Sequence, residues 1–482
     1  MRYAVPVNAA NEVSALAQAG ADELYCGYQD RWWIERYGNH DSASRRQGRA
    51  NFATLEELAR CVDASRVHGL PIWLALNSRY TEPQLDHLVT LCQRFEDMGG
   101  TGVILSDLGL LWRLHGATSL RRCLSLLAVA QNGATLKAYR QLGITRAVLP
   151  RFVGPDEADA LLRAVPGMEA EVMAFFDKCP WVDGYCRHRH GVTYAPRVVA
   201  EGEDDASPLY TFDTTYQTHA CLGRACTYLE PYPCAACFLP RFERVGVGLA
   251  KLGGRGRPLD ERLRAVRFLR AAQALPSDGE RARLYEQTFS QSCACYYGRA
   301  IQSRRAIEPV ERPSMGCAGT VLGSQTDYAA YQVGRAHLLE EIGLAGETPS
   351  NDAKVTLLVP PLADQELSEL CEALVSLPER SMAGLHLCVN DLGTFLTLEC
   401  MRRQQGCAFS LAPGTLLLRV DDPDEVRHCL SAQGNPPKAV WGPNGEPRVL
   451  TYRTPPEELV AHWNRPSFME PSAQEALAAL LG

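Results

Sequence analysis

The amino-acid sequence predicts an α/β protein: a TIM-like (β/α) barrel followed by a smaller α/β domain. Short apolar runs alternate with helical stretches in units of about 25 to 40 residues, which is typical of parallel α/β folds. About seven such units precede a cysteine-rich stretch, which supplies an eighth. An open, doubly wound sheet is the alternative. The total of eight units favours the barrel.

The elements follow in order. An apolar run at Tyr3–Val7 predicts the first strand, and residues 8–20 predict a helix with Gly20 beyond its end. Helices are also predicted over 53–69 and 81–100, and Asp107 is placed to cap the next one. The remaining barrel strands are predicted at Glu23–Gly27, Pro71–Asn77, Gly102–Leu105, Leu124–Ala130, Ala147–Pro150, Ala170–Phe175 and Gly246–Leu252.

Three domains are predicted along the chain: a barrel over 1–275, a connector or subdomain over 276–350, and a C-terminal α/β domain over 351–482. In the last domain, strands are predicted at 355–360, 384–390, 414–420 and 448–453, and helices at 364–377 and 455–464. The tripeptide DLG follows a strand at 107–109 and again at 391–393, and 358–370 resembles 4–16. We interpret the C-terminal domain as a diverged partial repeat of the barrel.

Composition indicates a soluble globular protein, with 46% hydrophobic and 22% charged residues. The net charge of -7 argues against a generally basic, nucleic-acid-wrapping surface but leaves room for a local basic groove. The N-terminus lacks the apolar region of a secretory signal, and no apolar run is long enough to span a membrane. With 18 cysteines, these features predict a reducing compartment, the cytoplasm.

Cysteines gather in one stretch of the chain. Thiolates in such a cluster are typical of iron–sulfur or other soft-metal sites. A structural zinc site and buried, inert thiols are the alternatives. The cysteines of this stretch stand at positions 179, 186, 221, 226, 234 and 237.

Polar residues follow the predicted strands, where the carboxyl ends of barrel strands would gather them at one face. Asn77, Asn132, Arg151 and Cys179 come just after apolar runs. RHRH at 187–190 could bind an anion, or be a solvated loop. HExxH and GxSxG are absent from the sequence. We predict four catalytic residues: Lys251, Arg255, Asn77 and Arg151.

Several sequence blocks together resemble the peptidase U32 family, over roughly residues 1–275. They are GADELYCG (20–27), RANF (49–52), LALN (74–77), the pair Cys179 and Cys186, and GVGLAKLGGR (246–255). The resemblance implies an iron–sulfur enzyme that hydroxylates an RNA base (tRNA or rRNA) or a quinone precursor without molecular oxygen. Prephenate, a small anion, is the implied donor. A protease and a non-catalytic iron–sulfur partner of a related U32 subunit are the alternatives.

The same resemblance implies a [4Fe–4S] cluster on Cys179, Cys186, Cys221 and Cys234. Cys226 and Cys237 are alternatives for the third and fourth ligands. A second metal site involving Cys293, Cys295 and Cys317 is left open. Residues 191–219 are longer than the family's usual spacer, and KLGGR has Gly where the family has Glu. The missing carboxylate weakens the case for hydrolysis.

Overall fold

The computed structural model describes two compact units. One holds residues 1–126, 143–176 and 232–297, and the other holds residues 127–142 and the described residues from 355 onward. The described residues are 1–37, 43–46, 48–78, 80, 82–176, 232–291, 295–297, 355–359, 362–383, 385–389, 391–413, 439–441 and 447–449.

The first unit is a closed barrel of eight parallel strands in sequence order. The barrel closes where β8 pairs with β1, with Ala4 opposite Lys251, while Ala4 also lies opposite Glu23 of β2. The prediction of a TIM-like barrel is therefore confirmed, and the open sheet is excluded. The strands are β1 (Arg2–Pro6), β2 (Glu23–Cys26), β3 (Ile72–Leu76), β4 (Gly102–Leu105), β5 (Arg121–Leu124), β6 (Arg146–Val148), β7 (Glu169–Phe175) and β8 (Leu249–Leu252).

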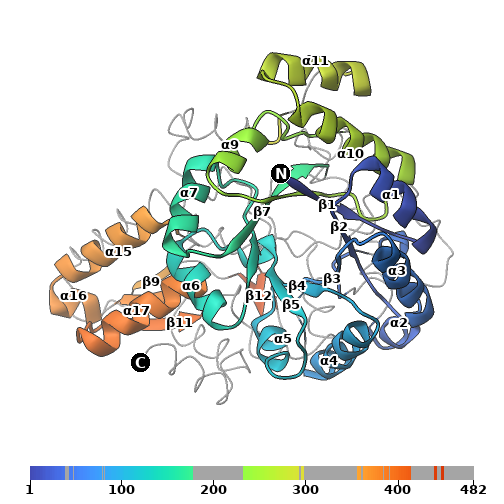
Figure 1. The fold of residues 1–482 in the computed structure, drawn as a ribbon. Coiled ribbons are helices and arrows are strands. Elements are labelled where there is room, and N and C mark those ends of the chain that lie inside the picture. Colours follow the sequence, from blue (N-terminus) through green and yellow to red (C-terminus); the bar gives the residue numbers. More distant parts are fainter. Residues whose placement is uncertain are drawn as a thin grey trace. The chain divides into compact units, whose positions relative to one another are not determined.

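Helices surround these strands (Figure 1). Their ends follow local signals: Thr54 accepts the N–H of Glu57 at 3.2 Å, and Asp107, the predicted cap, accepts that of Leu110 at 2.8 Å. Gly20 ends its helix at φ 103°. The helices of this unit are η1 (Ala10–Glu12), α1 (Val13–Ala19), α2 (Arg31–Tyr37), η2 (Gly48–Ala50), α3 (Leu55–Val67), α4 (Glu82–Asp97), α5 (Leu108–Arg113), α7 (Pro155–Ala164), α9 (Leu239–Arg244), α10 (Leu259–Gln273) and α11 (Asp278–Phe289).

The fifth strand differs from its prediction. The expected strand at 124–130 overlaps β5 only at Leu124 and is mostly the short helix η3 (Leu126–Ala128) and loop. The true strand begins with Arg121 and Arg122, so it does not read as an apolar run. Arg121 is half-exposed at the start of the strand, and its guanidinium pairs with Glu169 at 3.1 Å. Charged residues in the first half of the strand, which is not fully buried, thus hid it from hydrophobic patterning.

Aromatic packing fastens α10 and α11 to the barrel. Phe289 of α11 lies 5.4 Å from Phe175 of β7 and 5.3 Å from Phe268 of α10, between ring centroids. Tyr285 adds an edge-to-face contact with Phe268 at 5.6 Å. The segment after residue 275, where the apolar pattern weakens, therefore begins with a helix that belongs to the barrel unit.

The second unit contains a three-stranded parallel sheet in the order β11-β10-β9. The strands predicted at 355–360 and 384–390 are confirmed. The strand predicted at 414–420 and the helix predicted at 455–464 lie outside the described residues, as do residues 450–453 of the last predicted strand. The elements are η3 in part, α6 (Gly133–Gln141), β9 (Val355–Val359), α15 (Asp364–Ser376), α16 (Glu379–Ala383), β10 (Leu385–Val389), α17 (Leu392–Gln404), β11 (Ser410–Pro413), and the antiparallel pair β12 (Ala439–Trp441) and β13 (Pro447–Val449).

Two helix N-termini meet inside this unit. Asp391 caps α17 and also accepts hydrogen bonds from Thr135 Oγ1 at 2.7 Å and Asn132 Nδ2 at 3.1 Å. A Cβ on Gly393 would lie 2.0 Å from the backbone nitrogen of Thr135, so only glycine permits this approach. Asn132, expected among the strand-end residues, instead caps α6 and is committed to this junction. The interpretation of this unit as a diverged repeat stays a prediction.

Among the described residues, no helix has the length and apolar character needed to cross a membrane.

Candidate functional site at the barrel mouth

The barrel mouth is the end of the barrel unit where the strands' carboxyl ends open into loops. Asn77 follows β3, Arg151 follows β6 and Arg255 follows β8, so the parallel strands carry all three to this end. In barrels of this architecture the loops at this face build the active site. Their placement agrees with the sequence analysis, and their catalytic roles stay predictions.

Three of the sequence blocks converge around Gly27. A Cβ on this glycine would lie 2.1 Å from Asn51 Oδ1 and 2.4 Å from Arg255 Nη1, so the two side chains approach the backbone closely. Arg255 is 5% exposed and donates to the Ser44 carbonyl at 2.6 Å, while the Ser44 hydroxyl donates to Asn51 at 2.6 Å. Asn51 was not predicted as a site residue, because it lies in a polar loop rather than after a strand. Its place in the RANF block was the available signal.

Asn77 and Arg151 lie in different surroundings at the mouth. The Oδ1 atom of Asn77 is buried and has no hydrogen-bond partner among the described residues. Such an acceptor is available to a ligand donor. Arg151 lies close enough to Tyr297 to act on its pKa, which burial raises well above the ordinary value and the Arg151 charge partly lowers.

Lys251 lies inside the barrel rather than beyond a strand end. It is the third of the four residues of β8. Its ammonium pairs with Glu171 of β7 at 3.0 Å and lies 4.3 Å from the centroid of the Tyr25 ring. Both charged side chains are buried, at 8% and 1% exposure. Glu171 was missed because it stands within an apolar run.

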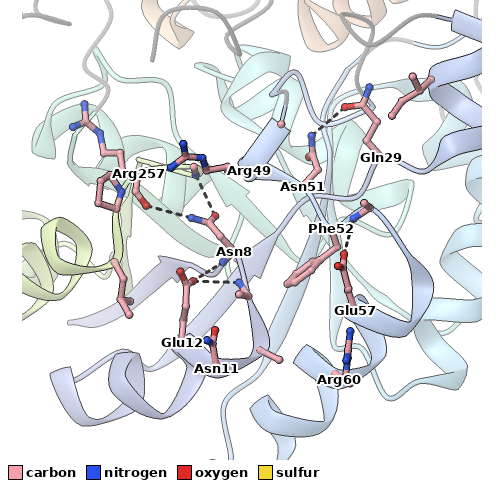
Figure 2. Close-up of a pocket in the computed structure, with 18 residues that line it drawn as sticks. Asn8, Asn11, Glu12, Gln29, Arg49, Asn51, Phe52, Glu57, Arg60 and Arg257 are labelled. Atoms are coloured by element: carbon pink, nitrogen blue, oxygen red, sulfur yellow. Dashed lines mark hydrogen bonds between the residues drawn. The ribbon is translucent and has the colours of Figure 1, made fainter. Parts of the chain in front are cut away.

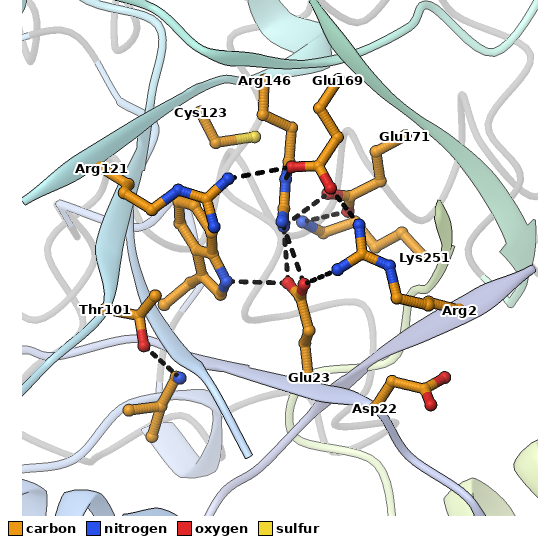
Figure 3. Close-up of polar contacts among 12 residues, drawn as sticks. Arg2, Asp22, Glu23, Thr101, Arg121, Cys123, Arg146, Glu169, Glu171 and Lys251 are labelled. Atoms are coloured by element: carbon orange, nitrogen blue, oxygen red, sulfur yellow. Dashed lines mark hydrogen bonds and ion pairs between the residues drawn. The ribbon is translucent and has the colours of Figure 1, made fainter. Parts of the chain in front are cut away.

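This pair continues into an interior charge network, defined as Arg2, Glu23, Arg121, Arg146, Glu169, Glu171 and Lys251 (Figure 3). Arg146 donates to Glu23 at 2.6 and 3.0 Å and to Glu169 at 2.6 Å, and lies 4.2 Å over the Trp73 ring. Burial alone would lower the Arg146 pKa, but the hydrogen bond to Glu23 and the charge of Glu171 raise it. Most members stand at the first position of their strands, at the end opposite the mouth, where barrel residues usually serve stability.

Only part of the predicted cluster can be placed. Cys179, Cys186, Cys221 and the alternative Cys226 lie outside the described residues, as do Arg187–His190, Cys293 and Cys317. Cys234 is 3% exposed, and its sulfur accepts the Ala236 N–H at 3.3 Å. Within the described ranges, no three His, Cys, Asp or Glu side chains come together as a metal site. A buried sulfur with a backbone donor suits a cluster ligand, since such bonds tune cluster thiolates.

Other cysteines have the properties of inert thiols. Burial raises the pKa of Cys61 to about 12 and that of Cys92 and Cys123 further. Neutral thiols are poor nucleophiles and poor metal ligands. These residues therefore pack the core rather than extend the site.

A pocket of about 900 Å3 opens at the mouth beside β1, β2 and β8 (Figure 2). Its wall includes Asn8 after β1, Gln29 after β2 and Arg257 after β8. Asn8 ties two of these loops together, because it donates to the Arg257 carbonyl at 3.3 Å and accepts the Gly256 N–H at 3.1 Å. This volume is within the range of small-molecule sites.

Comparison with known proteins identifies the family. Residues 8–304 match the profile of peptidase family U32, more than half of the chain, so the chain belongs to this family. It is similar to the tRNA hydroxylation protein P of Escherichia coli (strain K12), with 26% identity over 168 residues, and to that of Haemophilus influenzae, with 28% over 168 residues. Each match covers 35% of this chain and 34% of the relative, so the chain matches only about a third of the relatives' length.

Solved structures give weaker likenesses. A U32 peptidase shares 14% identity at a TM-score of 0.33, covering 54% of this chain and 94% of that one. A phosphonopyruvate hydrolase shares 14% identity at a TM-score of 0.30, covering 63% and 94%.

Proposed function

We propose that this member of peptidase family U32 is an oxygen-independent hydroxylase that acts on a base of tRNA. The observation that carries the proposal is the sequence similarity to two proteins named for tRNA hydroxylation. The barrel supports it, because the mouth gathers Asn51, Asn77 and Arg255 where this architecture builds active sites. A small anionic donor of the prephenate type would supply the oxygen.

A [4Fe–4S] cluster on Cys179, Cys186, Cys221 and Cys234 completes the proposal. When bound, such a cluster supplies one-electron redox chemistry. The residues of the chain would do the remaining work at the mouth. Arg255, fixed by the Ser44 carbonyl, can orient an anionic group, and the Asn77 amide oxygen can accept a donor from the substrate.

The cluster is tested by anaerobic purification of the full chain, followed by visible spectra and iron and sulfide analysis. We expect a brown protein whose broad absorption is lost in Cys179→Ala and Cys234→Ala. Cys237→Ala is the matched control, three residues along the same segment, and should keep the colour. A colourless protein, or one that carries only zinc, would contradict the cluster. Colour lost in Cys237→Ala but kept in Cys234→Ala would move the fourth ligand to Cys237.

The reaction is tested in cells. Nucleosides from the tRNA of a strain lacking this chain should contain one component lighter by a single oxygen atom, measured by mass spectrometry. Expression of the wild-type chain under anaerobic growth should restore the heavier nucleoside, whereas Cys179→Ala should not. An unchanged nucleoside profile would refute tRNA as the substrate.

A further inference from the structure

We propose that the pocket of Figure 2 is an oxyanion-binding subsite for phosphate or carboxylate groups, to which Arg49 and Arg60 each contribute a guanidinium from the wall. The identity of the anion rests on the proposed function, which offers two sources: a phosphodiester of the RNA and a carboxylate of the small donor. Both present oxygens that a guanidinium binds in a bidentate manner.

The charge balance of the pocket carries this inference. Glu12 is already neutralised, because Arg262 donates to it at 2.6 and 2.9 Å and the N–H groups of Asn8 and Ala9 also point to it. Arg257 is paired with Glu261 at 2.9 Å. The fold therefore satisfies these two charges without a ligand.

Two guanidinium groups remain. Arg49 and Arg60 line the pocket, are exposed, and have no ion-pair partner among the described residues. Against them stands one carboxylate, Glu57, which accepts the Ala53 N–H at 3.1 Å at the start of α3. A surplus of cationic groups in a concave site attracts anions, and it is notable in a chain of net charge -7.

The backbone that carries Arg49 is held in place. Gly256 has φ +82°, and a Cβ there would lie 3.5 Å from both the nitrogen and the Cβ of Ala50, so the loop after β8 packs closely on the Arg49 loop. On the other side, Phe52 donates to the Gly27 carbonyl at 2.9 Å and accepts from the Gln29 N–H at 3.0 Å. Arg60 stands on the regular helix α3. Rigid support of this kind lowers the entropic cost of binding.

The test measures binding to the full-length, anaerobically purified chain by calorimetry at fixed salt. The probes are prephenate and a tRNA transcript made in vitro, and the variants are Arg49→Ala and Arg60→Ala. Arg66→Ala is the matched control, since Arg66 lies on the same helix as Arg60, pairs with Asp63 at 2.6 Å and does not line the pocket. We expect at least one probe to bind about tenfold more weakly to both pocket variants, and normally to the control.

Each outcome decides the inference. Weakened prephenate binding alone assigns the subsite to the carboxylate, weakened RNA binding alone assigns it to the phosphodiester, and weakening of both indicates a shared site. Arg49→Lys should recover only part of the affinity, because lysine keeps the charge but loses the fork. If neither probe distinguishes the pocket variants from Arg66→Ala, or neither binds the wild type, the proposal is overturned.

This test is independent of the cluster and of turnover. A colourless protein whose probe binding still depends on Arg49 would support the subsite and contradict the proposed iron–sulfur function. A brown, active protein whose pocket variants bind the probes normally would support the proposed function and contradict the subsite.

Discussion

Arg146 at one end of the barrel and the pair Arg49 and Arg60 at the other differ in burial and in charge pairing. At the amino ends of the strands, Arg146 is 1% exposed and donates hydrogen bonds to the carboxylates of Glu23 and Glu169. At the mouth, Arg49 and Arg60 are exposed and lack ion-pair partners among the described residues. A buried charge without a partner costs several kcal/mol, whereas an exposed one costs little. We therefore expect Arg146 to serve stability, and Arg49 and Arg60 to serve the proposed binding of an anion.

The largest expected effect comes from removing the centre of the interior charge network. Arg146→Ala should lower the free energy of unfolding by about 3–5 kcal/mol, because Glu23 and Glu169 lose their one fully buried cation and keep only the half-exposed Arg2 and Arg121. Urea denaturation followed by circular dichroism measures the loss. Arg163→Ala is the control: Arg163 pairs with Asp159 at 2.5 Å on an exposed helix face, where such pairs contribute less than about 1 kcal/mol. Equal effects of the two variants would contradict the structural role of the network.

A double variant should show whether Lys251 has a structural or a catalytic role. Lys251→Met should lower the free energy of unfolding by about 3 kcal/mol, because buried Glu171 loses its closest cation and keeps only Arg146, at 3.7 Å. The double variant Lys251→Met with Glu171→Gln should recover much of that loss. Anaerobic hydroxylation of tRNA by the double variant then decides the role of Lys251. Activity that returns with stability makes Lys251 structural, whereas a stable but inactive double variant makes it catalytic.

The pH dependence of stability should differ between Asp391, whose hydrogen bonds come from neutral groups, and Glu169, which pairs with arginine. Burial raises the pKa of Asp391, and the hydrogen bonds from Thr394 and Thr135 only partly offset this. Burial alone would also raise the pKa of Glu169, but the hydrogen bond and charge of Arg146 lower it overall. The contribution of Asp391 to stability is thus fully present below its unfolded pKa, about 3.9, and is lost as pH rises through its folded pKa.

Glu169 has the opposite sign: its contribution is present above its unfolded pKa, about 4.3, and is lost as pH falls through its lowered folded pKa. Thermal melts of Asp391→Asn and Glu169→Gln across pH, each compared with wild type, measure both. The melting temperature of Asp391→Asn should rise relative to that of wild type as pH rises. The melting temperature of Glu169→Gln should be lower than that of wild type, and this difference should shrink as pH falls below about 4. If the difference in melting temperature between variant and wild type changes with pH in the same direction for both variants, the opposite pKa shifts of Asp391 and Glu169 are contradicted.

The smallest effect is expected at the mouth. Arg60→Ala should change the free energy of unfolding by less than about 0.5 kcal/mol, because the side chain is exposed and makes no ion pair among the described residues. Urea denaturation beside Arg146→Ala checks this. A loss of more than about 2 kcal/mol would show that Arg60 supports the fold rather than a ligand.

Much of the barrel could be read from the sequence because most strands are continuous apolar runs, as parallel strands buried on both faces require. Capping was equally readable: Asp107 lies directly before its helix and satisfies its first N–H groups. The reading failed at β5, where Arg121 replaces an apolar residue. It also did not select Glu171 or Asn51, whose roles depend on partners far away in the chain.

Sequence alone therefore determined the strand–helix order, the helix caps and the U32 blocks, since each depends on neighbours along the chain. Tertiary structure decided which charges meet. The tripeptide DLG shows the difference: Asp107 and Asp391 cap their helices alike, but Asp391 also binds Asn132 and Thr135 of another helix. Likewise, Lys251 looks like a mouth residue until Glu171 is found 3.0 Å away. Local hydrogen bonds follow from local sequence, whereas the partner of a buried charge is fixed only when the barrel closes.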